Sequence, residues 1–216
     1  GGSLNNRLRL TIEVLEAVQA AVDGQLLIGL RMLGTEDQPG GLDQSDCCEI
    51  AVTLSSTGLL DFINVAGPAI ATDDGLSKAI PPAGTPFSPY LAMAAAIRRS
   101  VNIPILHATR VNDLSAARHA IESGAVDLVG MTRAHMADPH LVEKLERGEP
   151  NRIRTCVGAS LCINRLHLGL DSVCIQNPAT GREGSVPQLV KRTSGPRRRV
   201  VVVGGGPAGL EAARTC

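Results

Sequence analysis

Apolar residues recur along residues 7–22 at the three- and four-residue intervals of one helix face. The positions are Leu8, Ile12, Leu15, Val18 and Val22. This spacing predicts an amphipathic helix over 7–22. The next run, residues 25–33 with the sequence QLLIGLRML, is almost continuously apolar. Such a run is typical of a strand buried on both faces of a parallel sheet.

The same alternation continues along the chain. We predict helices over 44–57, 89–100, 114–123 and 140–147, and further strands over 60–66, 103–109 and 127–133. Four strands that alternate with helices indicate an α/β fold with a parallel sheet. A doubly wound sheet and a (β/α)8 barrel share this pattern, so periodicity alone leaves both architectures open.

Two of the predicted strands end in an arginine, Arg110 in HATR and Arg133 in GMTR. In a barrel, functional groups sit at the carboxyl ends of the strands, and the loops after the last two strands often hold a phosphate. A guanidinium suits a phosphate because its planar fork donates paired, charge-assisted hydrogen bonds. Two solvated arginines are the alternative, and their matched placement favours the phosphate site.

A glycine-rich loop follows a polar segment near the end of the sequence. Residues 185–198 contain Pro and Gly without periodicity and read as a linker. A predicted strand over 200–203 then leads into Gly204, Gly206 and Gly209, which form G-x-G-x-x-G before a helical run. These glycines permit a tight turn, the approach of a pyrophosphate and close helix packing. The motif predicts dinucleotide binding, against the alternative of an ordinary glycine turn.

Composition narrows the classes of partner. Lys plus Arg and Asp plus Glu both number 21, so no net field attracts nucleic acid or an anionic membrane surface. No apolar stretch approaches the roughly 18 residues of a membrane span. Six cysteines lack the regular spacing of a secreted disulfide framework and favour a reducing compartment, the cytoplasm. Because the chain starts at Gly1 and stops soon after the glycine loop, we expect a piece of a longer protein.

Three of the cysteines, Cys156, Cys162 and Cys174, precede the linker with the spacing C-x5-C-x11-C. Together with GGSLNNRLRLTIEVLEAV, IGLRM, ILHATRVNDLSAARHAIESGAVDLVGMTRAHMADPHLVEKLERGEPNRIRTCVGA and VVVGGGPAGLEAAR, they give the chain its resemblance to a known family. The whole chain resembles the multi-domain relatives of Old Yellow Enzyme, a group that includes 2,4-dienoyl-CoA reductase, trimethylamine dehydrogenase and N-methylproline demethylase-like proteins.

The resemblance implies a division of the chain into four parts. Residues 1–150 would be the C-terminal half of an FMN-binding (β/α)8 TIM barrel, and residues 151–184 a segment that holds an iron-sulfur cluster, 4Fe-4S in the family. Residues 185–198 would be the linker, and 199–216 the first strand and glycine loop of a Rossmann-like domain for FAD or ADP with NAD(P)H. The full-length protein would be a homo-oligomer with a small-molecule substrate and an electron-transfer partner.

The resemblance also implies roles for single residues. Arg31 in GLRM matches the arginine whose charge stabilises the reduced flavin. Arg110 and Arg133 match residues of the FMN phosphate loops, helped by backbone amides. Those amides belong to the stretch around Thr109, Met131 and Thr132. The phosphate role agrees with the placement of both arginines at strand ends.

One departure from the family concerns the cysteine segment. Ala159 stands where the family has a cysteine, and alanine has no donor atom. The remaining thiols leave three alternatives: a cluster with a non-cysteine fourth ligand, a three-iron cluster, or a segment without a cluster. His167 is a candidate fourth ligand, although a histidine in a helical run is more often a surface residue. A zinc site made from His167 and the three cysteines is a further alternative.

A second departure concerns the proton donor. The reductase branch has a histidine after NVAG, and this chain has none there. Asp73 and Asp74 are the nearby acids, although adjacent acids in a loop usually face solvent. Tyr90 is a weak candidate for a pocket residue, and His107 either faces the flavin side or is a core histidine. The other cysteines, Cys47, Cys48 and Cys216, carry no functional prediction.

These observations favour a flavin-dependent oxidoreductase. The expected reaction is oxidative demethylation or dehydrogenation of a methylated amine, with electrons passing through the cysteine segment to a second nucleotide. The alternatives are an NADPH-dependent 2,4-dienoyl-CoA (enoyl) reductase and an inactive remnant or zinc-stabilised interaction module.

Overall fold

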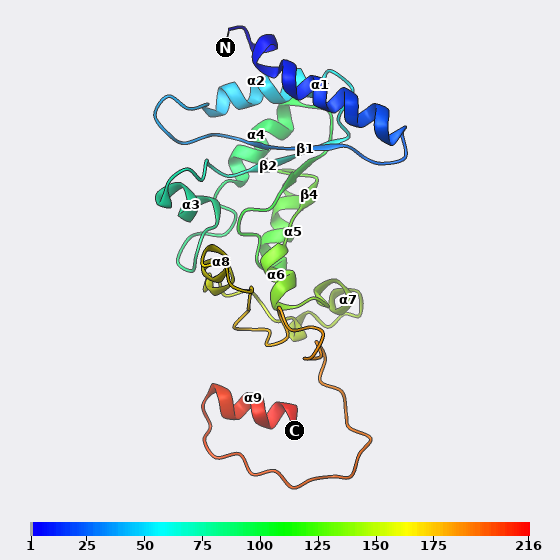
Figure 1. Ribbon diagram of the computed structural model, residues 1–216, viewed down its shortest axis with the longest axis vertical. Coiled ribbons are helices and arrows are strands. Elements are labelled where there is room, and N and C mark those ends of the chain that lie inside the picture. The colour runs from blue at the N-terminus through cyan, green and yellow to red at the C-terminus, as the bar shows by residue number, and fades with distance from the viewer. Residues whose placement is uncertain (1) are drawn as a thin grey trace.

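The computed structural model describes residues 2–216 and contains one parallel sheet. Its strands are β1 (Gly29–Leu33), β2 (Phe62–Ala66), β3 (Ile105–His107) and β4 (Leu128–Val129). Their order in the sheet, β1-β2-β3-β4, is their order in the sequence (Figure 1). A doubly wound sheet reverses its strand order at a switch point, whereas successive strands of a barrel are neighbours. The unreversed order therefore agrees with the predicted barrel architecture.

Helices connect the strands and cover one face of the sheet. The long ones are α1 (Leu4–Val22), α2 (Gln44–Ser55), α4 (Leu91–Ser100) and α5 (Leu114–Glu122). Their side chains form the main core with strand residues such as Ile63, Val65 and Ile105, each fully buried. The alternate strand residues, among them Arg31 and Leu106, belong to the opposite face because side chains alternate along a strand.

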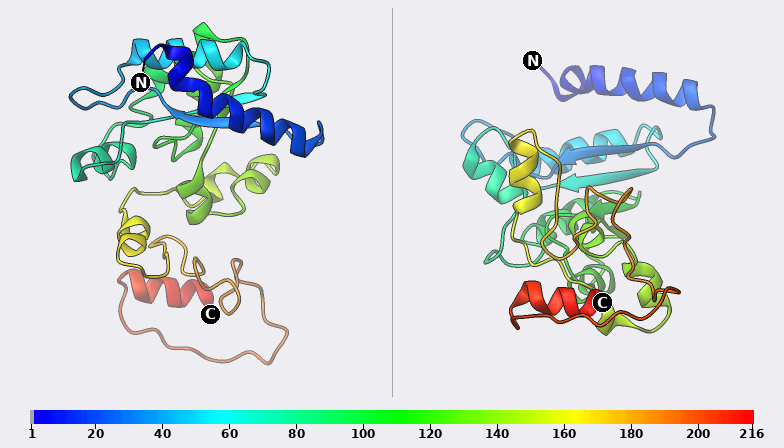
Figure 2. Two further views of the ribbon diagram at one scale, coloured as in Figure 1. Left: turned by 45° about the horizontal axis from the view of Figure 1, so that its top comes forward. Right: turned by 60° about the horizontal axis from the view of Figure 1, so that its bottom comes forward.

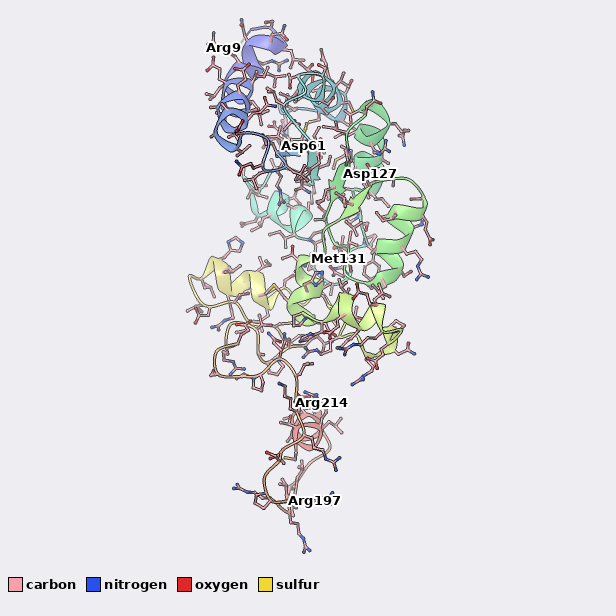
Figure 3. The ribbon with its side chains drawn as sticks, turned by 90° about the vertical axis from the view of Figure 1, so that its right-hand side faces the viewer. Arg9, Asp61, Asp127, Met131, Arg197 and Arg214 are labelled. Carbon is pink, nitrogen blue, oxygen red and sulfur yellow. The ribbon has the colours of Figure 1, made fainter. Side chains whose placement is uncertain are left out.

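Two aspartates fix the starts of the strands. Asp61 Oδ2 accepts a hydrogen bond from the Ile28 amide at 2.7 Å, and Asp127 Oδ2 accepts one from the Ile105 amide at 2.9 Å (both aspartates are labelled in Figure 3). Ile28 directly precedes β1 and Ile105 is the first residue of β3, so each bond lies at the amino end of the sheet. Arg98 of α4 pairs with Asp127 at 2.6 Å and joins the helix layer to this edge.

The shorter helices lie around the carboxyl ends of the strands and beyond them. They are α3 (Asp73–Ala79), α6 (Thr132–Ala137), α7 (Leu141–Glu146), the 3-10 turn η1 (Pro150–Arg152), α8 (Leu161–His167) and α9 (Pro207–Thr215). The apolar pattern did not predict α3, which follows Thr72, whose side chain accepts a hydrogen bond from the Gly75 amide. The last strand is shorter than predicted, because Thr132 and Arg133 belong to α6.

The predicted strand over 200–203 is wrong for this structure. Residues 199–203 form no strand, and Val201 and Val203 are 80% and 93% exposed. A strand needs a neighbour for its backbone hydrogen bonds, and in residues 2–216 none is paired with this segment. The long extended connection ends in α9, which lies at the opposite end of the molecule from α1 (Figure 2). None of the helices within residues 2–216 is long and apolar enough to cross a membrane.

Candidate functional site

A pocket opens where β1, β2 and β3 end, and we call it the strand-end pocket. Its lining combines Arg31 of β1 with apolar and small residues from the last positions of β1, β2 and α3 and from the loops that follow the strands. These are Leu33, Ala66, Gly67, Pro68, Ala69, Ile70, Ala71, Ala79 and Thr109. The structure thus brings together Arg31 and Thr109, two predicted site residues that are far apart in the sequence. Arg31 is exposed and supplies the only charge among the lining residues.

Close backbone packing shapes the floor of this pocket. A Cβ on Gly67 would lie 3.1 Å from the Tyr90 ring and 3.5 Å from Thr109 Oγ1, so the ring packs directly on the glycine. Burial, together with the charges of Asp37 and Asp74, raises the pKa of Tyr90, while Lys78 opposes this change. Gly67 was missed in the sequence, although its position between a buried strand and Pro68 is a turn signal.

The two strand-end arginines meet at one backbone oxygen rather than in the strand-end pocket. Arg110 Nη1 and Arg133 Nη1 both donate to the Pro81 carbonyl, at 3.2 and 3.0 Å. Arg110 Nε also donates to the Thr85 carbonyl at 2.9 Å, and its guanidinium lies 5.3 Å from the centre of the Phe87 ring. Burial and the charge of Arg133 lower the pKa of Arg110, while Cys156 opposes this change.

The three predicted cysteine ligands line a single cavity, which we call the cysteine cavity. The lining contains Cys156, Cys162 and Cys174 together with Arg133 of α6. The remaining lining residues come from two stretches, Val157–Leu161 and Val173–Gln176. Burial raises the pKa of Cys162, with the other two cysteines adding to the effect and Arg133 opposing it. All six cysteines of the described chain are free thiols.

The donor atoms around this cavity suit a cluster with three thiolate ligands. In a cluster each thiolate binds its own iron, so the sulfurs surround the group instead of converging on one point. Within residues 2–216 no three His, Cys, Asp or Glu side chains converge on the position of a single metal ion. Ala159 lines the cavity without a donor, whereas Ser160 and Gln176 bring oxygen atoms to it. His167 is exposed at the end of α8 and is not a lining residue.

A buried carboxylate ties the cysteine segment to the helices after β4. Asp138 is fully buried, and its Oδ2 accepts bonds from Lys144 Nζ at 2.5 Å and from the Arg154 amide at 2.8 Å. Burial by itself raises the pKa of Asp138, but these bonds outweigh it and hold the pKa below its ordinary value. Asn177 extends the attachment, since its Nδ2 donates to the Met136 carbonyl at 2.9 Å.

The glycine loop has the geometry expected of its first and third glycines. Gly204 has a φ of +105°, which favours glycine, and a Cβ on Gly209 would lie 2.0 Å from the Gly204 carbonyl oxygen. Gly206 caps the start of α9, and no atom lies within 4 Å of the position of its absent Cβ. The loop therefore packs tightly against its helix and leaves the middle glycine accessible.

The other candidate residues lie on the surface or in the core and not in the two cavities described above. Asp73 and Asp74 are exposed in the first turn of α3, and Asp74 pairs with Lys78 at 2.9 Å. His107 is fully buried, and its Nδ1 donates to the Val65 carbonyl at 2.9 Å, so it belongs to the core. Burial, with help from nearby acids, raises the pKa of Cys47 to about 11.

Comparison with known proteins identifies the fold and the family. Residues 1–152 match the NADH:flavin oxidoreductase / NADH oxidase family. The chain belongs to this family. Its curated relatives include N,N-dimethylglycine/sarcosine dehydrogenase of Chromohalobacter salexigens, 47% identical over 215 residues, and probable N-methylproline demethylase of Rhizobium meliloti, 47% identical over 214 residues. Each alignment covers 99% of this chain and 31% of the relative, so the chain spans about a third of their length.

Solved structures of the family extend the match over the whole chain. Histamine dehydrogenase from Rhizobium sp. 4-9 superposes with a TM-score of 0.88 at 29% identity, covering 100% of this chain and 31% of its own. A 2-naphthoyl-CoA reductase complex superposes with a TM-score of 0.89 at 28% identity, covering 100% of this chain and 32% of its own. The resemblance to the multi-domain relatives of Old Yellow Enzyme is therefore confirmed.

Proposed function

We propose that the chain is part of an FMN-dependent oxidoreductase that removes a methyl group from an N-methylated amine or amino acid. The observation that carries this proposal is the 47% identity, over nearly the whole chain, to two relatives named for N-methylated substrates. When bound, FMN would supply the hydride acceptor, and an iron-sulfur cluster held by the cysteines would supply one-electron transfer towards a second nucleotide.

The reaction balances with water as the only co-substrate besides the electron acceptor. A hydride leaves the N-methyl carbon while the nitrogen lone pair forms a C=N bond. Water then adds to this carbon, and the C–N bond breaks to release formaldehyde and the demethylated amine. Two electrons leave the substrate in the hydride, and the proton lost from water returns to solvent.

Arg31 is the residue we assign to the flavin ring. Its guanidinium is the charged group of the strand-end pocket, whose other lining residues are apolar or small. A positive charge beside apolar walls stabilises a neighbouring anionic ring more than a charge in water does. We assign the phosphate to Arg133 and to the backbone amides around Thr109, Met131 and Thr132, which belong to the loop after β3 and to the start of α6. Figure 3 places Met131 between the sheet and the cysteine segment.

The remaining assignments follow the chain towards its second cofactor. Cys156, Cys162 and Cys174 would hold the cluster, because their thiols line one cavity. Gly204, Gly206 and Gly209 would receive the pyrophosphate of FAD or ADP at the start of α9. We take residues 1–150 as the second half of the FMN barrel, 151–184 as the cluster segment, 185–198 as the linker and 199–216 as the start of the nucleotide domain.

Reduction of an unsaturated acyl thioester is the second candidate function. It is favoured by the fit to the 2-naphthoyl-CoA reductase complex and by a relative named multifunctional alkene reductase/demethylase, from Caballeronia cordobensis, at 42% identity. The two functions differ in the direction of hydride flow and in the need for a proton donor. No histidine follows β2 in the segment where the reductase branch would have one, which favours amine oxidation.

The test is steady-state assay of the purified holoenzyme with both classes of substrate. We expect bleaching of the flavin band near 450 nm and stoichiometric formaldehyde with N,N-dimethylglycine or N-methylproline. Arg31→Met should lower kcat by about 10²-fold, the size of effect seen when one electrostatic stabiliser is removed. Arg9→Met, an exposed arginine of α1, is the matched control and should leave kcat unchanged. Reduction of an enoyl-CoA without any turnover of methylated amines would contradict the proposal.

A further inference from the structure

Arg110 is turned away from the strand-end pocket and towards the cysteine segment. It lies in the loop after β3 with a φ of +54°, a left-handed conformation that is uncommon for a residue with a side chain. The side chain is 7% exposed and donates to the carbonyls of Pro81 and Thr85, in the loop between α3 and α4. These bonds hold Arg110 in one position and commit it to that loop.

The same guanidinium lies against the turn that separates the first two cysteines. A Cβ on Gly158 would lie 2.7 Å from Arg110 Nη1 and 3.0 Å from the Ala83 amide nitrogen. Gly158 is buried with a φ of +71°, and its carbonyl accepts a hydrogen bond from Ala83 at 2.8 Å. Arg110 and the loop at Ala83 therefore form the surface on which the turn after Cys156 rests.

Arg110 is left without a negative partner, because the flavin phosphate is assigned to Arg133. Neither Arg110 nor Arg133 forms an ion pair with a carboxylate within the part of the chain that the structure describes. Two cations share the Pro81 carbonyl, and the closeness of a second cation at a mostly buried site is unfavourable unless an anion compensates it. The charge of a Cys156 thiolate would raise the pKa of Arg110 and so favour its cationic form. Arg133 is itself one of the residues that line the cysteine cavity.

We propose that Arg110 is a positioning residue of the cysteine segment and not a ligand of the flavin phosphate. It holds the Gly158 turn, which sets the separation of Cys156 from Cys162. Its charge, with that of Arg133, stabilises the anionic sulfur ligands in the cysteine cavity. The part of this inference that concerns a cluster rests on the proposed function, whereas the part that concerns the turn does not.

The test compares variants of the holoenzyme by two independent measurements. Arg110→Gln removes the charge, and Gly158→Ala adds the methyl group that collides with Arg110. Arg118→Gln on α5 is the matched control, since this arginine is exposed and reaches only Glu122 at 3.9 Å. The first measurement is hydrogen exchange of the Ala83 amide, which reports its bond to Gly158. The second is the dissociation constant of FMN from fluorescence titration.

We expect exchange at Ala83 to rise at least tenfold in Arg110→Gln and in Gly158→Ala, with FMN affinity within threefold of the parent protein. Iron per subunit should fall in both variants. Where iron is retained in Arg110→Gln, the midpoint potential of the cluster should be lower. Reduction adds negative charge to the cluster, and the variant lacks the positive charge that stabilises the reduced state. The control should change none of these values.

Two results would overturn the inference. One is the behaviour of a phosphate ligand: Arg110→Gln would lose FMN affinity by tenfold or more, while Gly158→Ala would leave exchange at Ala83 unchanged. The other is unchanged exchange in both variants. A parent protein that binds no FMN and no iron would refute the proposed function, and the exchange measurement would still decide the position of Arg110.

Discussion

Removal of the Asp138 carboxylate should loosen the attachment of the cysteine segment to the helices that follow β4. In Asp138→Ala the Lys144 cation, whose side chain is 15% exposed, loses its carboxylate partner and keeps its bond to the Arg152 carbonyl, and the Arg154 amide loses its acceptor. Breaking a buried ion pair on one side costs about 3–5 kcal/mol, because the other charge stays buried without compensation. At about 1.4 kcal/mol for each factor of ten, the lower value corresponds to an increase of roughly 100-fold in the open population.

Trypsin cleavage after Arg154 measures that population in the holoenzyme. This residue is half-buried and its amide is bonded to Asp138, so cleavage requires local opening. We expect cleavage at this bond to accelerate about 100-fold in Asp138→Ala, and the double variant with Lys144→Met to recover part of the loss. Glu149→Gln, which removes only a 3.2 Å surface pair with Arg152, is the control and should change the rate less than twofold. Acceleration below threefold in Asp138→Ala would refute the reasoning.

The same carboxylate predicts the response to acid. Its pKa is lower in the folded protein than in the unfolded chain, so the unfolded chain takes up the proton first as the pH falls. The contribution of Asp138 to stability is therefore complete above the ordinary pKa of about 3.8 and is lost as the pH falls below it. Hydrogen exchange of the segment 153–163 should accelerate in this range in the parent protein and much less in Asp138→Ala.

Three further changes test other parts of the structure. Ala159→Cys adds a thiol to a residue that already lines the cysteine cavity, so iron per subunit and resistance of the cluster to oxygen should both increase; unchanged iron would show that the fourth position is already filled. Gly209→Ala places a Cβ 2.0 Å from the Gly204 carbonyl and should weaken FAD or ADP binding in a calorimetric titration, whereas Ala208→Ser should not. Burial lowers the pKa of His107 despite its bond to Val65, so unfolding by urea should become easier as the pH falls through about 6.5, and His107→Gln should reduce this dependence.

The periodic parts of the sequence predicted the sheet and its helices well. All nine predicted segments between residues 7 and 147 have the expected type, and β1 appears within the predicted 25–33 run. These elements are set by local spacing of apolar residues such as Leu8, Leu15 and Leu54, which the core then buries. Strand lengths were overestimated, since β4 consists of Leu128 and Val129 only. The sequence pattern indicates which residues are buried, but it does not show that the chain leaves the strand after Val129 and enters α6 at Thr132.

Contacts between distant segments could not be predicted from spacing. Arg110 and Arg133 were expected to face a phosphate, and nothing local indicates that both donate to the carbonyl of Pro81. The role of Asp138 was also missed, because its partners, Lys144 and the Arg154 amide, become neighbours only after α7 folds back. The valines before Gly204 have a strong preference for strand but form none, because a segment becomes a strand only when a neighbouring strand pairs with it.

The order of the sheet is also an order of synthesis. Because each strand pairs with the next one in the sequence, the sheet can grow by one strand and one helix at a time as the chain leaves the ribosome. The loop at Pro81 and the helix that carries Arg133 are made before Cys156 appears. The cysteines therefore emerge next to a surface that can fold first, and the cluster that we propose for them would assemble after the sheet.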